Sequence, residues 1–314
     1  TEICDVIHWM RLCRELFCLT GEISYMEALE KAFLNAFLAG VYEDGRNGAF
    51  FVRSSGRHWA AEPQTETKYQ HCCVNNVARG FASAAESIIM EGEDGFYINQ
   101  YIQSRIRFGE VSFRIGAGYV DRGEAAVSVR GIKEGKKLYL RIPAWSKKTI
   151  VRVIGDRTYE TTECGSWFSL EHIKDGQVIR MKFDMTPHIL DFSGVLQKDL
   201  PQEDYHIRRW MDPNDGLCNR ELMVKQPMSI IQRGPVILAR SKRIGSREEE
   251  MFGQKSVWGK KCSVSAQMLR HDRLLTLCRV AIQEPQGTDT MLMCDYASAA
   301  NRDVEDARYF TIFV

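Results

Sequence analysis

The sequence lacks any apolar run that approaches the ~20 residues needed to cross a bilayer. It also lacks an excess of charge of either sign, because 42 lysine and arginine residues stand against 41 aspartate and glutamate residues among 314. Balanced charge gives no electrostatic reason to expect a membrane surface or a nucleic acid as partner. We therefore predict a globular chain with no nucleic-acid and no membrane partner.

A signal peptide, internal repeats and low-complexity tracts are also not visible. The first residues already have the pattern of a helix interior, so we expect the chain to be the C-terminal portion of a longer protein. The ten cysteines lack the dense, regular spacing of a small secreted disulfide scaffold, which favours a reducing, cytoplasmic compartment. Four of them lie in apolar surroundings and are expected to be buried thiols: Cys13, Cys18, Cys278 and Cys294.

The spacing of apolar residues divides the chain into a helical part and a β part. Helical periodicity covers residues 3–19, 24–39 and about 73–90, with a short strand expected around 49–53. Alternating residues then predict a β-sandwich with strands near 96–102, 111–115, 125–129, 138–142, 149–154, 167–170 and 178–183. Residues 190–225 have an irregular, polar pattern, 228–239 predict a strand pair, 243–250 a solvated loop, and 256–314 a small β region that closes on 309–314.

These patterns together predict an α+β multidomain fold. The helices occupy 1–93, the β-sandwich 94–190, and return strands with a C-terminal β-rich region 191–314. Three helices cannot bury their own apolar faces convincingly. We therefore expect them to be a piece of a larger helical domain.

Two cysteine motifs carry the chemical signal. Cys72 and Cys73 are adjacent in the stretch HCCVNN, and Glu2 and Cys4 open the chain. Adjacent cysteines cannot easily bond to each other, whereas one carboxylate and three thiolates form a donor set that zinc accepts. The set lacks the paired CxxC knuckles of a structural zinc site, so buried cysteines beside a surface glutamate explain the pattern equally well. A thiolate held on zinc at neutral pH can also act as a nucleophile.

Several segments resemble glycoside hydrolase family 127 and its close relative, family 146. The resemblance rests on residues 1–4 (TEIC), 25–40 (YMEALEKAFLNAFLAG), 71–76 (HCCVNN) with 78–79, 140–145 (LRIPAW), 232–239 (QRGPVILA) and 294–301 (CDYASAAN). These segments occur in the family's order and extend over nearly the whole chain. Each motif is weak alone, but their combination is specific.

The resemblance implies the C-terminal helices of an (α/α)6 catalytic barrel, followed by β-sandwich domains. It implies a retaining glycosidase that acts on β-L-arabinofuranosides or related sugars, with a plant-type arabinofuranosyl oligosaccharide or glycoconjugate as substrate. The matching positions make Glu2, Cys4, Cys72 and Cys73 the zinc ligands and Cys72 the nucleophile. A thioglycoside on Cys72 would then be cleaved by water. The sequence leaves a homodimer open.

Two features depart from the family pattern. Family members commonly have proline after the double cysteine, where this chain has Val74 and Asn75, although Asn76 matches. This places the chain in a divergent branch and leaves the exact sugar and linkage open. The family's acid/base glutamate lies shortly before the Glu-x-Cys motif, a position that precedes residue 1. We therefore expect residues 1–314 to lack their general acid and to hydrolyse substrate negligibly.

Other side chains are given a predicted role from the motifs that lie near them in the sequence. His58, Tyr69 and His71 lie in the polar connection 41–71 and are predicted to contact the sugar, since rings can stack on it and donate hydrogen bonds. For His71, a structural role at the start of a helix has equal weight. His8 is expected in the core or behind a ligand, and Arg79 in a structural ion pair.

Two rival functions stay open. A cysteine hydrolase of peptides or amides would use Cys72 with His71, but adjacent residues rarely place an imidazole correctly on a thiol. A non-catalytic alternative is a carbohydrate-binding or structural protein whose zinc only staples helices together.

Overall fold

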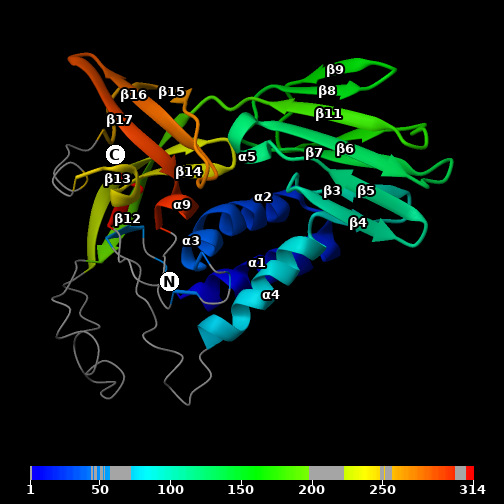
Figure 1. Cartoon of the computed structure of the whole chain (residues 1–314), viewed down its shortest axis with the longest axis horizontal. Helices are drawn as coiled ribbons and strands as arrows, with labels where there is room; N and C mark the ends of the chain where they lie inside the picture. Colours follow the sequence, from blue (N-terminus) through cyan, green and yellow to red (C-terminus); the bar gives the residue numbers. More distant parts are fainter. Residues whose placement is uncertain are drawn as a thin grey trace.

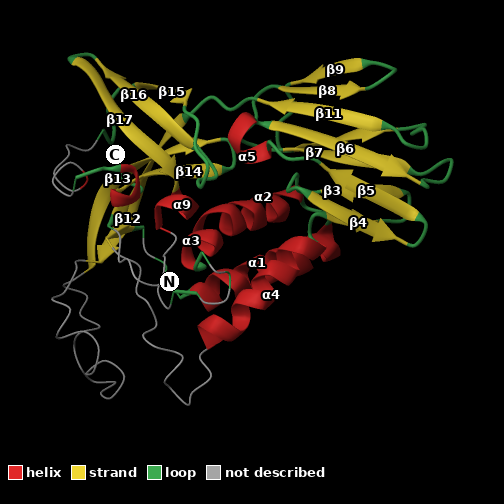
Figure 2. Cartoon of the chain, in the orientation of Figure 1, coloured by secondary structure: helices red, strands yellow, loops and turns green. Residues whose placement is uncertain are grey.

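The computed structural model describes residues 2–43, 45, 48–49, 52, 54–56, 72–197, 223–247, 251, 257–300 and 309–314. It is a mixed structure, in which a group of helices lies against several β-sheets (Figures 1 and 2). Within the described ranges, no helix is long and apolar enough to cross a membrane.

The helical part forms as its periodicity predicts. Helix α1 (Ile3–Thr20) buries one apolar face and ends at Gly21, whose left-handed backbone (φ 71°) lets its N–H donate to the Phe17 carbonyl. Helix α2 (Ile23–Lys31) continues without a break through the π-helical segment η1 (Ala32–Phe37) into α3 (Leu38–Gly40). Helix α4 (Cys72–Glu86) packs on α1. The helices expected over 3–19 and 24–39 are therefore confirmed.

The C-terminal end predicted for the third helix is wrong. Helix α4 stops at Glu86, and Ile89–Glu91 form strand β2, which pairs with β3 (Gly95–Ile98). The apolar residues at 88–90 fit a helical period and a buried strand equally well, and pairing with β3 decides between them.

The predicted β-sandwich is confirmed as two sheets packed face to face. One sheet has the order β10-β7-β3-β2, with β7 at Lys137–Ile142 and β10 at Ser166–Leu170. The other has the order β4-β5-β6-β11-β8-β9, with strands at Ser104–Phe108, Val111–Ile115, Glu124–Arg130, Val178–Phe183, Thr149–Val153 and Thr158–Thr161. Phe96 of β3 contacts Phe113 of β5 between the sheets, with ring centroids 5.1 Å apart. A short helix, α5 (Tyr119–Arg122), joins β5 to β6.

A third sheet follows in sequence. Its path is β1-β18-β14-β17-β16-β15, and β13 pairs with both β14 and β12. The strands are β1 Ser55–Gly56, β12 His188–Gln197, β13 Met223–Arg233, β14 Val236–Ser241, β15 Ser263–Met268, β16 Leu277–Glu284, β17 Gly287–Asp295 and β18 Phe310–Thr311. Helix α9 (Tyr296–Ala300) follows β17. The strand pair over 228–239 and the terminal β region are confirmed.

Two further expectations are wrong, and a third falls mostly outside the described residues. The stretch 190–225 is not wholly irregular, because β12 pairs with β13 over ten residues. Of the strand expected around 49–53, only residues 49 and 52 are described, and both lie outside any strand; the nearby strand is β1. Arg243 does not belong to a solvated loop, since it forms an ion pair with Glu43 and donates to the Ser298 carbonyl at 3.0 Å. The domain boundaries at 93 and 190 stay a prediction.

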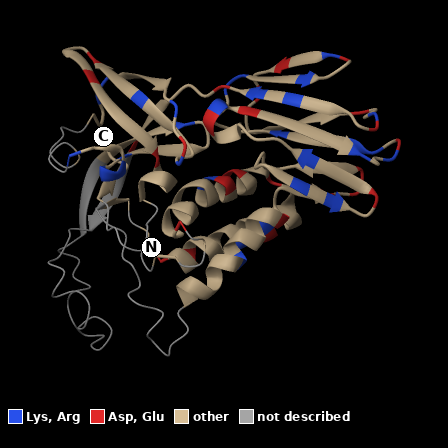
Figure 3. Ribbon diagram, in the orientation of Figure 1, with Lys and Arg blue, Asp and Glu red and all other residues tan. Residues whose placement is uncertain are grey.

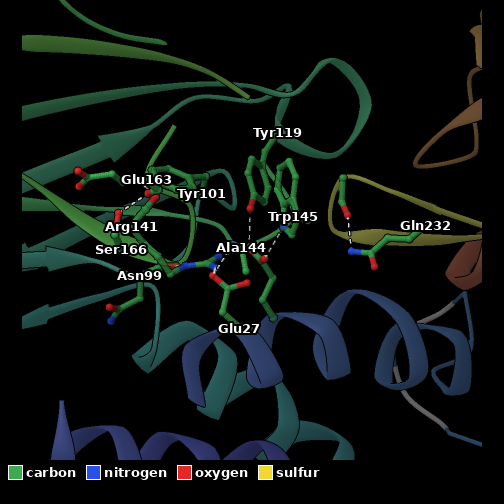
Figure 4. Close-up of polar contacts among 12 residues, drawn as sticks. Glu27, Asn99, Tyr101, Tyr119, Arg141, Ala144, Trp145, Glu163, Ser166 and Gln232 are labelled. Carbon is green, nitrogen blue, oxygen red and sulfur yellow. Dashed lines mark hydrogen bonds and ion pairs between the residues drawn. The ribbon is translucent and has the colours of Figure 1, made fainter. Parts of the chain in front are cut away.

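A buried polar network joins α2 to the sandwich (Figure 4). The guanidinium of Arg141 on β7 donates to Glu27 at 2.6 Å and also to Glu30. Tyr119 donates to Glu30 at 2.7 Å, and the Trp145 indole at 3.3 Å. These groups lose their water at the junction, so their mutual hydrogen bonds fix the sandwich against the helices.

A second link joins the helices to the third sheet. The amide of Asn35, in η1, donates to the Pro235 carbonyl at 3.0 Å and accepts from the Ile237 N–H at 2.7 Å. Both groups belong to the turn and the first residues of β14. The helices are therefore held at two places by buried hydrogen bonds.

Candidate metal centre

Two parallel helices begin at the same place. Glu2 precedes the first turn of α1, which contains Cys4, and Cys72 and Cys73 form the first turn of α4. The end of α4 also lies beside α1, since Glu86 forms an ion pair with Arg14 at 3.3 Å, so the two helices run in the same direction. The positive end of each helix dipole therefore lies beside these donor atoms, where negative charge is favoured.

The four donor atoms form a tetrahedron with edges of 3.1 to 4.0 Å. The three sulfurs of Cys4, Cys72 and Cys73 are 3.6, 3.9 and 3.9 Å apart. Glu2 Oε2 lies 3.1, 4.0 and 3.8 Å from the same sulfurs, in that order. An ion with metal–sulfur distances of about 2.3 Å places tetrahedral sulfurs about 3.8 Å apart. The spacing thus fits one ion the size of zinc at the centre of the group.

The cysteines differ in their access to solvent. Cys73 is fully buried and Cys4 is 6 % exposed, whereas Cys72 is exposed. Cys72 is therefore the exposed member of the three cysteines.

The chemistry of the donor set also fits a cation. Burial, and then hydrogen bonding with Glu2 and Cys72, raises the pKa of the Cys4 thiol far above its usual value. Burial and the charge of the neighbouring Cys72 raise the pKa of Cys73 to about 12. Without a cation these two thiols are protonated at neutral pH, but coordination to a metal ion deprotonates a thiol outright.

Backbone and amide contacts hold the first turns in place. The Glu2 N–H donates to the Asp5 carboxylate at 3.3 Å. Asn76, which is buried, donates to the Cys72 carbonyl at 2.9 Å and accepts from Arg79 at 3.3 Å. The double-cysteine motif showed Asn76 as a matching position but gave no role for it. The structure shows that it fixes the backbone of Cys72.

The structure brings together the four predicted ligands and leaves the predicted sugar contacts untested. His58, Tyr69 and His71 lie outside the described residues. His8 is exposed, so its expected place in the core is wrong. Arg79 bonds to Asn76, and no ion pair joins it to another residue of the described ranges.

The cysteines outside the four-residue metal group differ in burial. Cys13, Cys278 and Cys294 are buried, as expected, and burial raises the pKa of each. Cys18 is exposed, which corrects the expectation for it, because it lies on the outward face of α1. Every cysteine within the described ranges is free of disulfide bonds.

Comparisons with known families agree with this picture. A family model described as the β-L-arabinofuranosidase GH127 catalytic domain matches residues 1–86. A second model, the GH127 middle domain, matches residues 95–185. Together these matches cover more than half of the chain. Among curated proteins, none matches the sequence.

Solved structures share the fold over the whole chain. One described as a glycoside hydrolase is 17 % identical with a TM-score of 0.65, and the aligned part is 52 % of its length. A GH127 β-arabinofuranosidase is 18 % identical with a TM-score of 0.65 and is covered over 49 %. Ara127N-Se, a GH127 β-L-arabinofuranosidase from Geobacillus stearothermophilus T6, is 18 % identical with a TM-score of 0.61 and is also covered over 49 %. The chain thus spans about half the length of the structures that it matches.

Proposed function

The chain belongs to glycoside hydrolase family 127, and on that premise we propose that it carries the nucleophile of a retaining β-L-arabinofuranosidase. The substrate would be an arabinofuranosyl oligosaccharide or glycoconjugate. The observation that carries the proposal is the tetrahedron of Glu2, Cys4, Cys72 and Cys73, in which one of the three cysteines, Cys72, is exposed.

The proposed ligands are the four atoms of this tetrahedron, and the proposed ion is zinc. When bound, zinc would keep the sulfurs as thiolates at neutral pH. Cys4 and Cys73 are buried and would serve only as ligands, with Glu2 completing the set. Cys72 is exposed and would also react.

In the proposed reaction, Cys72 Sγ attacks the anomeric carbon of the sugar. The carbon–sulfur bond forms as the bond to the leaving oxygen breaks, and a general acid gives that oxygen its proton. Water then attacks the same carbon, the carbon–sulfur bond breaks, and the water's proton passes to the conjugate base of the acid. Two displacements at one carbon retain its configuration.

The rest of the active site would come from a larger helical domain. We propose that α1–α4 are the last helices of an (α/α)6 barrel, and that the general acid precedes Thr1. The exposed face of α1 supports this, because Trp9 and Leu12 are each 49 % exposed and Leu19 is 81 % exposed. Large apolar side chains on one helix face are usually covered by another element. His58, Tyr69 and His71 remain proposed sugar contacts.

A metal titration tests the ligand set. We expect the protein to hold about one equivalent of zinc, and Cys72→Ser and Cys73→Ser each to lower zinc affinity strongly, since each removes one of four donors. The matched control is Cys164→Ser, which changes an exposed cysteine far from the cluster in sequence. Metal-free, correctly folded protein, or equal loss in the Cys164 variant, would contradict the site.

A covalent label tests the nucleophile. An aryl β-L-arabinofuranoside with an activated leaving group needs no proton donor for the first step, so residues 1–314 can be tested without an acid. Mass spectrometry is expected to find one pentosyl group on the peptide that contains Cys72, and none in the Cys72→Ser variant. Zinc binding with no label, or a label on Cys164, would instead favour a protein whose zinc only staples helices.

A further inference from the structure

The outer face of the six-stranded sheet is unusually rich in arginine. Residues 95–185 contain 16 lysines and arginines and 10 aspartates and glutamates, although the whole chain is nearly neutral. The strands alternate in burial, so one face packs inside the sandwich and the other lies in solvent. Figure 3 shows basic residues crossing several strands of this sheet.

The pairing of the strands aligns these arginines in rows. Arg105 of β4 lies directly opposite Arg114 of β5, and Ser128 of β6 follows in the same row. The next row, one step along the strands, runs Arg107, Ser112 and Arg130. Rows in a sheet lie about 7 Å apart along the strands, and strands about 4.8 Å apart across them. Four guanidinium groups are therefore concentrated around two serine hydroxyls.

Arg180 of β11 and Arg152 of β8 lie opposite each other and extend the same face. We call Arg105, Arg107, Arg114, Arg130, Arg152 and Arg180 the arginine face.

This surface is hollowed and its charge is not neutralised. A groove of about 420 Å³ lies over β4, β5 and β6, lined by the first four of these arginines with Ser112 and Ser128. All six arginines are exposed. Within the described ranges, none of them forms an ion pair. The acidic residues at outward strand positions, Glu124 and Glu160, do not line the groove and pair with Lys182 and Lys148.

The stability of the sheet does not explain why these arginines lie together on one face. Like charges directly opposite each other in a sheet are destabilising, and the face contains two such pairs. Charged residues on an edge strand protect it from pairing with other chains, which could explain Arg105 and Arg107 on β4. That reason does not apply to Arg114, Arg130 or Arg180, because their strands are paired on both sides.

We propose that the arginine face binds a carboxylate-bearing polysaccharide, a chain of uronate sugars. A guanidinium holds a carboxylate through two parallel hydrogen bonds, and rows of guanidinium groups fit an anionic chain with repeating carboxylates. Ser112 and Ser128 supply hydroxyls for sugar hydroxyls between the charges. The choice of a glycan rests on the proposed function, since the face would then hold an acidic region of the polymer that carries the substrate.

Nucleic acid fits the face less well. Proteins that bind single strands combine positive charge with aromatic side chains on which bases stack. Ile106 and Phe113 also line the groove, but Phe113 is only 3 % exposed and its ring packs against Phe96 inside the sandwich. The exposed side chains of the groove are arginines, so it offers no exposed aromatic ring for a base, which favours recognition of carboxylates and hydroxyls.

Direct binding tests the proposal separately from hydrolysis and from zinc. Titration calorimetry of residues 1–314 with oligogalacturonate at low salt is expected to show binding that weakens as salt rises. The same oligomer with its carboxylates methyl-esterified is expected not to bind. Failure of the zinc or labelling experiments would leave this measurement intact, so the two proposals can fail independently.

Paired substitutions locate the site. Arg105→Gln with Arg114→Gln removes one opposed pair, and affinity for oligogalacturonate is expected to fall by about tenfold or more, since each change removes a charge-assisted contact. The control is Arg270→Gln with Arg279→Gln, which removes the same charge from exposed arginines of the region 263–284 and is expected to leave affinity within about twofold. The groove variant is expected to unfold at the same or a higher temperature, because a repulsive pair is gone.

Three outcomes would overturn the proposal: equal binding of the esterified oligomer, equal loss of affinity in the control pair, or tighter binding of a single-stranded oligonucleotide of matched charge.

Discussion

The guanidinium of Arg141 donates to the carboxylate of Glu30 in the interior, where Arg141 is fully buried and the Glu30 side chain is 2 % exposed. Arg141 stands on β7 of the sandwich and Glu30 on α2, 111 residues earlier. Glu27 shares the same guanidinium, so one positive charge serves two carboxylates. This buried cation is therefore a central part of the junction between the sandwich and the helices.

Loss of Arg141 is expected to be strongly destabilising. Arg141→Met keeps much of the side-chain volume but leaves Glu27 and Glu30 without their cation, and breaking a buried pair in this way costs about 3–5 kcal/mol. Unfolding in urea measures the change. Arg152→Met is the control, because Arg152 is exposed and has no ion pair within the described ranges, and its effect is expected within about 0.5 kcal/mol. Equal effects for both variants would refute a special role for the buried pair.

Stability is expected to fall above about pH 10. Burial raises the pKa of Tyr101 and of Tyr119 well above the usual value for a phenol. In the unfolded chain both ionise near pH 10, while in the folded chain both stay neutral, so the unfolded state binds fewer protons there. The contribution of each phenol is fully present below pH 10 and declines by about 1.4 kcal/mol per pH unit above it.

Tyr101→Phe isolates this effect. The variant loses a hydrogen bond to the Arg141 carbonyl and is expected to be less stable at pH 8. The informative quantity is therefore the slope of the free energy of unfolding between pH 10 and 11.5, which is expected to be shallower than in the unchanged protein. Parallel slopes would show that Tyr101 does not titrate differently in the two states.

Local periodicity was enough to predict most elements, but not those decided by distant partners. Helix α1 and strand β11 were predicted within a residue of their ends, because each has several turns or residues of one clear period. Strand β12 was missed because it pairs with residues 223–232, which lie on the other side of a long connection. The ion pair of Arg243 with Glu43 spans two hundred residues and left no local signal.

The candidate metal centre could likewise be predicted only in part from local sequence. The residue types of Glu2, Cys4, Cys72 and Cys73 suggested a zinc set, but the pattern alone could not separate it from unrelated buried cysteines. The convergence of α1 and α4, which brings the donors within 4.0 Å of one another, is a property of helix packing. Likewise the motif LRIPAW was predicted only as a signature, and the structure shows that Arg141 and Trp145 both bond to Glu30.

Gly80 is expected to tolerate no larger residue. A Cβ at this position would lie 2.7 Å from Phe37 Cζ and 3.1 Å from Ile7 Cγ1, so α4 packs here with no space to spare. Alanine favours helix by about 1 kcal/mol over glycine, but overpacking in a core typically costs about 1–3 kcal/mol. Gly80→Ala is therefore expected to be net destabilising in thermal unfolding.

A reverse exchange on the same helix is the control. Ala78 is exposed, so Ala78→Gly measures helix propensity alone and is expected to cost about 1 kcal/mol. If helix propensity alone determined the effect, Gly80→Ala would stabilise the protein and Ala78→Gly would destabilise it. We expect both to destabilise.

Asn35→Asp is expected to weaken the hydrogen-bonded link between the helices and β14, while the side chain keeps its shape. The Asn35 amide donates to the carbonyls of Lys31 and Pro235, and its oxygen accepts from the Ile237 N–H. A carboxylate keeps the acceptor but turns a second oxygen toward two carbonyls, and it buries a charge. Loss of a hydrogen-bond donor at a buried site costs about 1–3 kcal/mol, and a charged group costs more.

The pH dependence distinguishes this cause from a general loss of packing. Burial would raise the pKa of the new carboxyl group, so below that pKa the group is neutral and can donate one hydrogen bond again. Relative to the unchanged protein, the variant is therefore expected to lose more stability at pH 7 than at pH 4.5, as measured by urea unfolding at both values. Gln103→Glu makes the same amide-to-acid exchange at an exposed position and is expected to show little change at either pH. If Asn35→Asp lowered the free energy of unfolding equally at both pH values, the cause would be altered hydrogen-bond geometry. A buried charge cannot be the cause in that case, because protonation would remove it.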